Sequence, residues 1–155
     1  MSFQAIIIIP ITLVLLTSYF FGFTPPLIAI AFLSFGLISY YQYARDKKAA
    51  IKGEWRVPEN TLHILALFCG WPGALIAQHK FRHKTKKVSF RVVFWLTVLV
   101  NVSTLIWLHL PQGNLALHKT MSTIQSIIDS QVSNNHVRSV AHAITSFRTN
   151  IFNLQ

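Results

Sequence analysis

Charged side chains are scarce in this chain, and acidic ones are the scarcest. Of its 155 residues, 12% are charged and 52% are hydrophobic, and only four are Asp or Glu. A soluble domain carries about a quarter of its residues as charged ones, so this composition excludes an ordinary soluble domain. Uncharged apolar runs long enough to cross a bilayer predict a membrane protein instead.

Cysteine is limited to Cys69, which excludes an intramolecular disulfide framework and a cysteine-based zinc site. The N-terminus lacks the basic residues that begin a secretory signal peptide, and its apolar run continues to Phe23. We therefore expect a retained membrane anchor. A nucleophile–base constellation and a glycine-rich phosphate loop are also missing, so the sequence predicts no catalytic residue and no cofactor.

The apolar stretches organise residues 1–110 into a predicted membrane domain. Three of them are predicted transmembrane helices, at residues 3–23, 26–44 and 90–110. The second ends in Tyr40, Tyr41 and Tyr43, aromatic residues of the kind that gather at a membrane–water interface. The expected fold class is therefore an all-α, polytopic membrane protein.

A further apolar stretch, residues 61–78, is barely long enough to span. Gly70, Trp71, Pro72 and Gly73 interrupt it and predict a hairpin turn. If the stretch spans, the basic segments on its two sides face opposite compartments; if it dips in and returns, both stay in the cytoplasm. The positive-inside rule favours the second topology, a re-entrant helical hairpin. The N-terminus is then cytoplasmic, and the C-terminus lies on the opposite side of the membrane.

Residues 111–155 differ from the predicted membrane domain, because their apolar residues alternate with polar ones at helical spacing. This pattern predicts a tail of amphipathic helices. The apolar positions that recur at helical spacing are Leu117, Met121, Ile124 and Ile128, and then Val137, Val140, Ile144, Phe147, Ile151 and Leu154. The polar faces are mostly uncharged, which weakens a role in binding anionic lipid. Packing on the protein's own helices or on a protein partner, through residues 115–155, is the alternative.

Basic residues are concentrated in the middle of the chain. Eleven of the fourteen Lys and Arg lie between Arg45 and Arg91, and residues 79–91 hold six of them with two His and no acid. Such a segment is either a topology determinant lying on anionic head groups, at about 1 kcal/mol per basic residue, or a phosphate-binding site. The candidate residues for binding phosphate or lipid head groups are Arg56, Arg82, His83, Lys84, Lys86 and Lys87.

A polar cluster is predicted at the mouth of the hairpin, made of Asp46, Glu59, His63 and Gln78. Glu59 and His63 are four residues apart, which suits a proton relay or ligand pair, or else a helix-start acid with an interfacial histidine. His79 and His83 have the spacing of paired metal ligands, but the surrounding lysines would repel a dication, so no metal site is predicted.

The stretch from Tyr40 to about Trp95 resembles a small bacterial membrane domain of unknown function, which in some proteins follows a cold-shock domain. The resemblance lies in Trp55-Arg56-Val57-Pro58-Glu59, Gly70-Trp71-Pro72-Gly73 and Arg82-His83-Lys84-Thr85. Members commonly have paired glycines before the tryptophan, where this chain has Cys69-Gly70. The cold-shock fusions imply that the side bearing the N-terminus meets nucleic acid. Only "MSFQ" precedes the first apolar run here, so direct nucleic-acid binding is not expected.

These observations predict a non-enzymatic inner-membrane accessory or interaction protein, a subunit or partner of a larger membrane complex with a basic cytoplasmic surface on anionic lipid. One alternative is an enzyme or transporter acting on a phosphorylated lipid or other anionic substrate. His63, His83 or Glu59 would then transfer protons, while Arg82 and Lys84 would hold phosphate. A second alternative is a membrane tether for nucleic acid.

Overall fold

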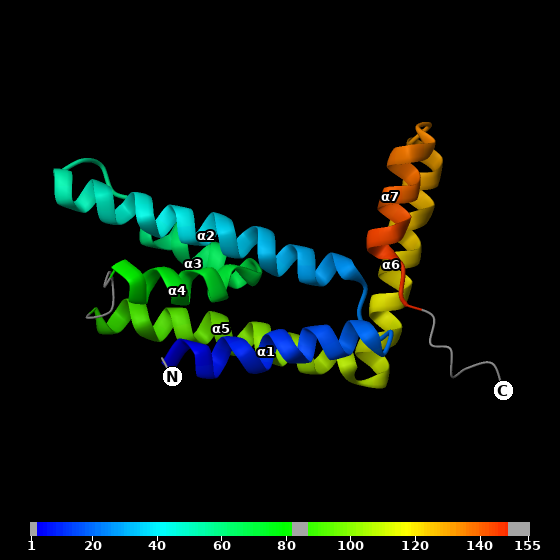
Figure 1. Ribbon diagram of the computed structural model, residues 1–155, viewed down its shortest axis with the longest axis horizontal. Helices are drawn as coiled ribbons and strands as arrows, with labels where there is room; N and C mark the ends of the chain where they lie inside the picture. The colour runs from blue at the N-terminus through cyan, green and yellow to red at the C-terminus, as the bar shows by residue number, and fades with distance from the viewer. Residues whose placement is uncertain (1–2, 82–86, 149–155) are drawn as a thin grey trace. The chain divides into compact units, whose positions relative to one another are not determined.

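The computed structural model describes residues 3–81 and 87–148, with side chains from Ile8 onward, and every regular element in these ranges is a helix (Figure 1). The helices are α1 (Phe3–Phe20), α2 (Pro26–Lys52), α3 (Glu59–Leu65), α4 (Trp71–Phe81), α5 (Val88–His109), α6 (Pro111–Gln131) and α7 (Asn135–Thr145), and a short π-helical turn, η1 (Ala66–Gly70), joins α3 to α4. The predicted all-α fold class is confirmed.

The chain forms two compact units. The first consists mainly of Ile30–Thr104 and contains most of α2, the segment from α3 to α4, and most of α5. The second combines Ile7–Ala29 with the chain from Leu105 onward, and so contains most of α1 together with α6 and α7. The predicted polar cluster and the described basic residues of the predicted basic region belong to the first unit.

Three helical segments are long and apolar enough to cross a membrane: α2, Glu59–Phe81 and α5. On α2 the outward side chains of Leu33 and Leu37 are 65% and 63% exposed, a pattern expected where helices face lipid. A membrane location is therefore suggested.

Two of the three segments correspond to predicted spans, and the third does not. The spans predicted at 26–44 and 90–110 correspond to α2 and α5, and the third long apolar segment is Glu59–Phe81. The predicted span at 3–23 begins in residues whose side chains are not described. In α1 the apolar stretch with described side chains is the shorter Ile8–Phe20. Helix α2 also continues to Lys52, because the residues after Ala44 are mostly good helix formers.

The inward face of α2 carries three polar residues among apolar ones. Its buried residues recur every three or four positions and are Phe32, Gly36, Ser39, Tyr43, Asp46 and Ala49. In a membrane protein, polar side chains on a spanning helix turn toward the bundle interior because lipid cannot satisfy them. The three polar positions therefore identify the side of α2 that meets the rest of the unit.

Residues 59–81, the bent segment, lie between α2 and α5 and reverse direction (Figure 1). At its start, Lys87 Nζ, next to α5, lies 2.8 Å from Glu59 Oε2. Near its end, Gln78 bonds Tyr43 on α2. Both ends thus lie at the same end of the first unit. In the bent segment 44% of the residues in its most apolar stretch are buried, against 22% for each of α2 and α5, so this segment is the most enclosed of the three.

The reversal occurs just before the predicted turn residues. Phe68 (φ −86°, ψ 56°) and Cys69 (φ 65°, ψ 2°) leave the helical region, and α4 begins at Trp71. Pro72 therefore occupies the first turn of a helix, where proline is tolerated. Gly70-Trp71-Pro72-Gly73 begins the returning helix, and Trp71 is fully buried.

Gly73 allows α4 to lie against the backbone of α2. A Cβ atom built on Gly73 would be 1.8 Å from the carbonyl oxygen of Gly36. Small residues permit such close approach between membrane helices. The glycine in the sequence motif is thus required by a helix contact.

Asn101 of α5 stabilises the bend from the other side. Its Nδ2 donates to the carbonyl oxygens of Leu67 at 2.9 Å and Ala66 at 3.3 Å, and to that of Thr97 at 2.9 Å. Carbonyls where a helix breaks lose their regular partners, and buried ones need replacements. A single buried amide provides them here.

In the second unit, α6 and α7 pack side by side and run in opposite directions. Gln125 Nε2 donates to Thr145 Oγ1 at 3.0 Å, and His142 Nε2 lies 2.9 Å from Asp129 Oδ1. On the predicted apolar face of α6, Leu117 and Met121 are buried. Helix α7 stops at Thr145 because Ser146 is extended, so the predicted helical pattern ends before Phe147, and Ile151 and Leu154 lie outside the described residues.

Candidate functional site

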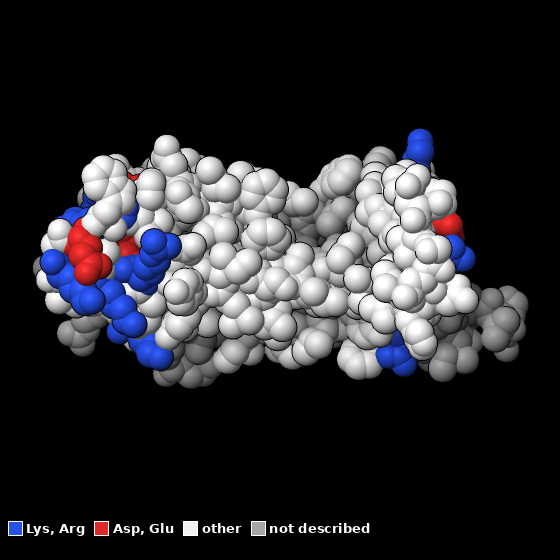
Figure 2. Space-filling view, turned by 90° about the horizontal axis from the view of Figure 1, so that it is seen from above, with Lys and Arg blue, Asp and Glu red and all other residues white. Residues whose placement is uncertain are grey.

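Basic residues gather at one end of the first unit, where α2 ends and α3 and α5 begin. Figure 2 shows Lys and Arg side chains clustered there with a few acids, beside a long uncharged face of the same unit. The described members are Arg45, Lys47, Lys48, Lys52, Arg56, Lys80, Lys87 and Arg91. We call this region the charged end.

Asp46 anchors the connection between α2 and α3. Its side chain is fully buried, and its Oδ1 accepts a hydrogen bond from the backbone N–H of Val57 at 3.1 Å. Gly53 takes a positive φ of 71°, and the N–H of Glu54 donates to the carbonyl of Ala49 at 3.0 Å. A buried carboxylate is stable only when it is hydrogen-bonded or paired. The 53–58 connection is therefore held against α2 in a defined conformation.

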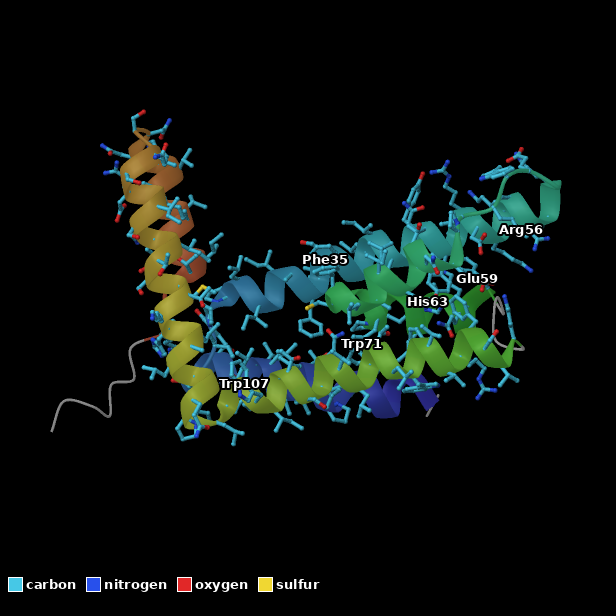
Figure 3. All side chains as sticks on the ribbon, turned by 180° about the vertical axis from the view of Figure 1, so that it is seen from behind. Phe35, Arg56, Glu59, His63, Trp71 and Trp107 are labelled. Carbon is cyan, nitrogen blue, oxygen red and sulfur yellow. The ribbon has the colours of Figure 1, made fainter. Side chains whose placement is uncertain are left out.

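Glu59 and His63 both contact the start of α5. Lys87 Nζ donates to Glu59 Oε2 at 2.8 Å, and the His63 ring lies 4.3 Å from the Phe90 ring, measured between centroids. Figure 3 shows Arg56, Glu59, His63 and Trp71 in order from the charged end inward. These contacts join α3 to α5, which favours a structural role for the pair.

Gln78 lies in the interior of the unit. Its Nε2 donates to the hydroxyl of fully buried Tyr43 at 3.1 Å, and the Tyr43 ring meets Phe90 edge-on with centroids 6.3 Å apart. Tyr43 was missing from the predicted cluster. The helical spacing of Ser39, Tyr43 and Asp46 within an apolar helix is the signal that identifies it.

The structure brings the four predicted cluster residues to the same end of the first unit: Asp46, Glu59, His63 and Gln78. Among the predicted phosphate-binding residues, Arg56 and Lys87 are described, whereas Arg82, His83, Lys84 and Lys86 lie outside the described residues. The ammonium of Lys87 is paired with Glu59. In the described part of the chain, no group of three or more His, Cys, Asp or Glu side chains is arranged to hold a metal ion.

A groove of about 230 Å³ opens at the charged end, and we call it the Arg45–Arg56 groove. Its lining comes from α2, the 53–58 connection and α3, and consists of Gln42, Arg45, Trp55, Arg56, Val57, Pro58 and Thr61. Arg56 was among the residues predicted to bind phosphate, whereas Arg45 and Gln42 were not. Only the folded connection places Arg56 beside them.

Comparisons with known proteins identify a family for this chain but indicate no activity. Residues 36–90 match the family model described as "Protein of unknown function (DUF1294)". The chain is 32% identical to the uncharacterised protein YsdA of Bacillus subtilis (strain 168) over 65 residues, which cover 42% of this chain and 73% of YsdA. No solved structure gives a significant match. The matched region begins at Gly36, which contacts Gly73, and ends at Phe90, which contacts His63. The chain therefore belongs to the DUF1294 family of proteins of unknown function.

Proposed function

We propose that the chain is a non-enzymatic accessory protein of a bacterial inner membrane whose charged end contacts anionic lipid head groups. The observation that carries the proposal is the separation of charge: the basic residues gather at one end of a unit whose outward helix faces are apolar (Figure 2). Anionic lipid attracts basic segments next to a membrane by about 1 kcal/mol per residue. The charged end therefore lies at the cytoplasmic leaflet.

We further propose that the bent segment is a re-entrant hairpin. Its reversal meets α5 at Asn101, 13 residues after Val88, or about 20 Å along a helix. The hydrocarbon core is about 30 Å thick, so the bend turns back before it crosses. With α1, α2 and α5 as spans, the N-terminus is cytoplasmic and the C-terminus periplasmic.

Cysteine labelling tests this topology. Single cysteines at Gly53→Cys, Ser89→Cys and Gln112→Cys, in a Cys69→Gly background, are treated in intact and permeabilised cells with a maleimide that cannot cross the inner membrane. Under the proposal the first two react only after permeabilisation, and Gln112→Cys reacts in intact cells. Labelling of Gly53→Cys and Ser89→Cys from opposite sides would show that the bent segment spans.

The accessory role rests on the second unit. Val137 and Val140 on α7 are 53% and 62% exposed, which leaves apolar side chains available for a protein partner. The experiment is affinity purification of the full chain in mild detergent, compared with a chain truncated at Pro111. Loss of associated membrane proteins on truncation supports an accessory role.

A matched substitution tests the role of His63 at the charged end. His63→Phe keeps a ring against Phe90 but removes the imidazole. Under the proposal this variant keeps its partners and complements a deletion strain as the wild type does. A variant that inserts normally and keeps its partners, yet fails to complement, would instead indicate chemistry. Salt-sensitive binding of duplex DNA by the purified chain would indicate a nucleic-acid tether.

A further inference from the structure

The Arg45–Arg56 groove presents two guanidinium groups without acidic partners. None of its lining residues is acidic. Among the described residues, the nearest acids in sequence contact other groups: buried Asp46, next to Arg45, accepts a hydrogen bond from the Val57 N–H, Glu54 lies 3.6 Å from Lys52, and Glu59 lies 2.8 Å from Lys87. No hydrogen bond or ion pair joins Arg45 or Arg56 to any part of the chain that the structure describes. Their donors are therefore available to an external anion.

The other polar groups of the groove suit a phosphate. Gln42 adds an amide, Thr61 a hydroxyl and Trp55 an indole N–H, so five side chains with N–H or O–H donors line one small opening. Guanidinium groups bind phosphate oxygens in pairs of parallel hydrogen bonds, which makes arginine well suited to this anion. Small-molecule sites typically have about 300–1,000 Å³, so the smaller volume of about 230 Å³ suits a head group better than a complete drug-sized ligand.

The groove is held in place before any ligand arrives. The hydrogen bond from the Val57 N–H to buried Asp46 fixes the connection that carries Arg56. The N–H of Thr61 donates to the carbonyl of Pro58 at 3.1 Å, which starts α3 directly after the connection. A site ordered in advance loses less conformational entropy when it binds.

Trp55 indicates where the anion comes from. Its side chain is 94% exposed at the rim of the groove. An indole has an apolar body and one N–H, and tryptophan is enriched at the level of lipid head groups for this reason. Under the proposed function, a groove at the end of the apolar part of α2 opens at head-group depth.

We infer that the Arg45–Arg56 groove binds the phosphodiester of an anionic phospholipid, with Trp55 inserted among the neighbouring head groups. Two cations and no acid favour a head group of net negative charge over a zwitterionic one. The inference rests on the proposed function, because it needs the charged end to lie against lipid. It goes further by assigning recognition to one groove rather than to the summed charge of the surface.

The test measures lipid binding by native mass spectrometry of the full chain in detergent, titrated with phosphatidylglycerol against phosphatidylcholine. The variant Arg45→Gln/Arg56→Gln is compared with Lys47→Gln/Lys48→Gln, which removes the same charge from α2 outside the groove. We expect at least tenfold weaker phosphatidylglycerol binding in the arginine variant, a change of about 1.4 kcal/mol, and less than a threefold change in the lysine variant. The conservative Arg45→Lys/Arg56→Lys should fall between wild type and glutamine variant, because lysine keeps the charge but loses the paired donors.

Each of the other outcomes would refute a specific part of the proposal. Equal losses in the arginine and lysine variants would refute the groove and leave the proposed charged surface standing. Competition by inorganic phosphate or glycerol phosphate as effective as by phosphatidylglycerol would refute a lipid source. No preference for phosphatidylglycerol in the wild type would overturn both the groove and the proposed lipid contact. Unfolding midpoints of all variants, followed by tryptophan fluorescence, establish that the exposed substitutions leave the fold intact.

Discussion

The contact between Gly36 and Gly73 makes two alanine substitutions behave differently, although each adds one methyl group to the same interface. A Cβ on Gly73 would lie 1.8 Å from the carbonyl oxygen of Gly36, whereas real Cβ atoms essentially never come closer than 3.0 Å. A Cβ on Gly36 would meet the backbone nitrogen of Gly73 at 3.7 Å, an ordinary contact. Gly73→Ala is therefore expected to disrupt the interface, and Gly36→Ala to fit it.

The magnitude follows from the required movement. Relieving the Gly73→Ala clash needs α2 and α4 to separate by more than 1 Å, and both atoms at the contact belong to rigid backbone. That movement would open the contacts of Ala74 and Ala77, both fully buried. Overpacking typically costs about 1–3 kcal/mol, while replacing glycine by alanine in a helix returns about 1 kcal/mol. We expect Gly73→Ala to lose up to about 2 kcal/mol of unfolding free energy, and Gly36→Ala to be neutral or slightly stabilised.

The assay is equilibrium unfolding of the full chain in mild detergent by added SDS, followed by tryptophan fluorescence. Trp71 is fully buried two residues from Gly73, so its emission reports the opening of this contact. Gly36→Ala serves as the matched control because it adds the same group at the facing position. Equal stability of the two variants would refute the close approach of α2 and α4.

Three further substitutions test the bend and the charged end by the same unfolding assay. Cys69→Gly should stabilise the chain by about 1 kcal/mol, because Cys69 has a φ of 65° that disfavours any side chain. Cys69→Ala should bring no such gain. A gain from both variants would mean that the thiol, and not the backbone conformation, destabilises the chain. Asn101→Leu should destabilise by about 1 kcal/mol, since the carbonyls of the bend lose their donor; unchanged stability would mean that the amide is dispensable. Lys87→Gln should cost less than about 1 kcal/mol, because its bond to Glu59 is partly exposed, and the cost should disappear at high salt; a large, salt-independent loss would contradict a surface ion pair.

The polar cluster at the hairpin mouth was predicted from residues that are far apart in the chain. Asp46, Glu59, His63 and Gln78 were expected together, and the structure brings them to one end of the first unit. Their individual contacts could not be predicted, because each partner lies on another element. Arg45 was passed over for the same reason: on α2 it is one more basic residue, and it becomes part of a groove only when the 53–58 connection folds back beside it.

Three features of the protein can be read directly from its sequence: the helical fold class, the apolar helices at 26–44 and 90–110, and the concentration of basic charge between Arg45 and Arg91. These are local properties, set by the length of apolar runs and the position of charges along the chain. The position of the bend at Phe68 and Cys69, and the role of the following glycines in close packing, depend on contacts between distant helices and are visible only in the folded chain. A glycine can permit a turn or a close contact, and only the backbone of a distant helix, here α2, selects between the two.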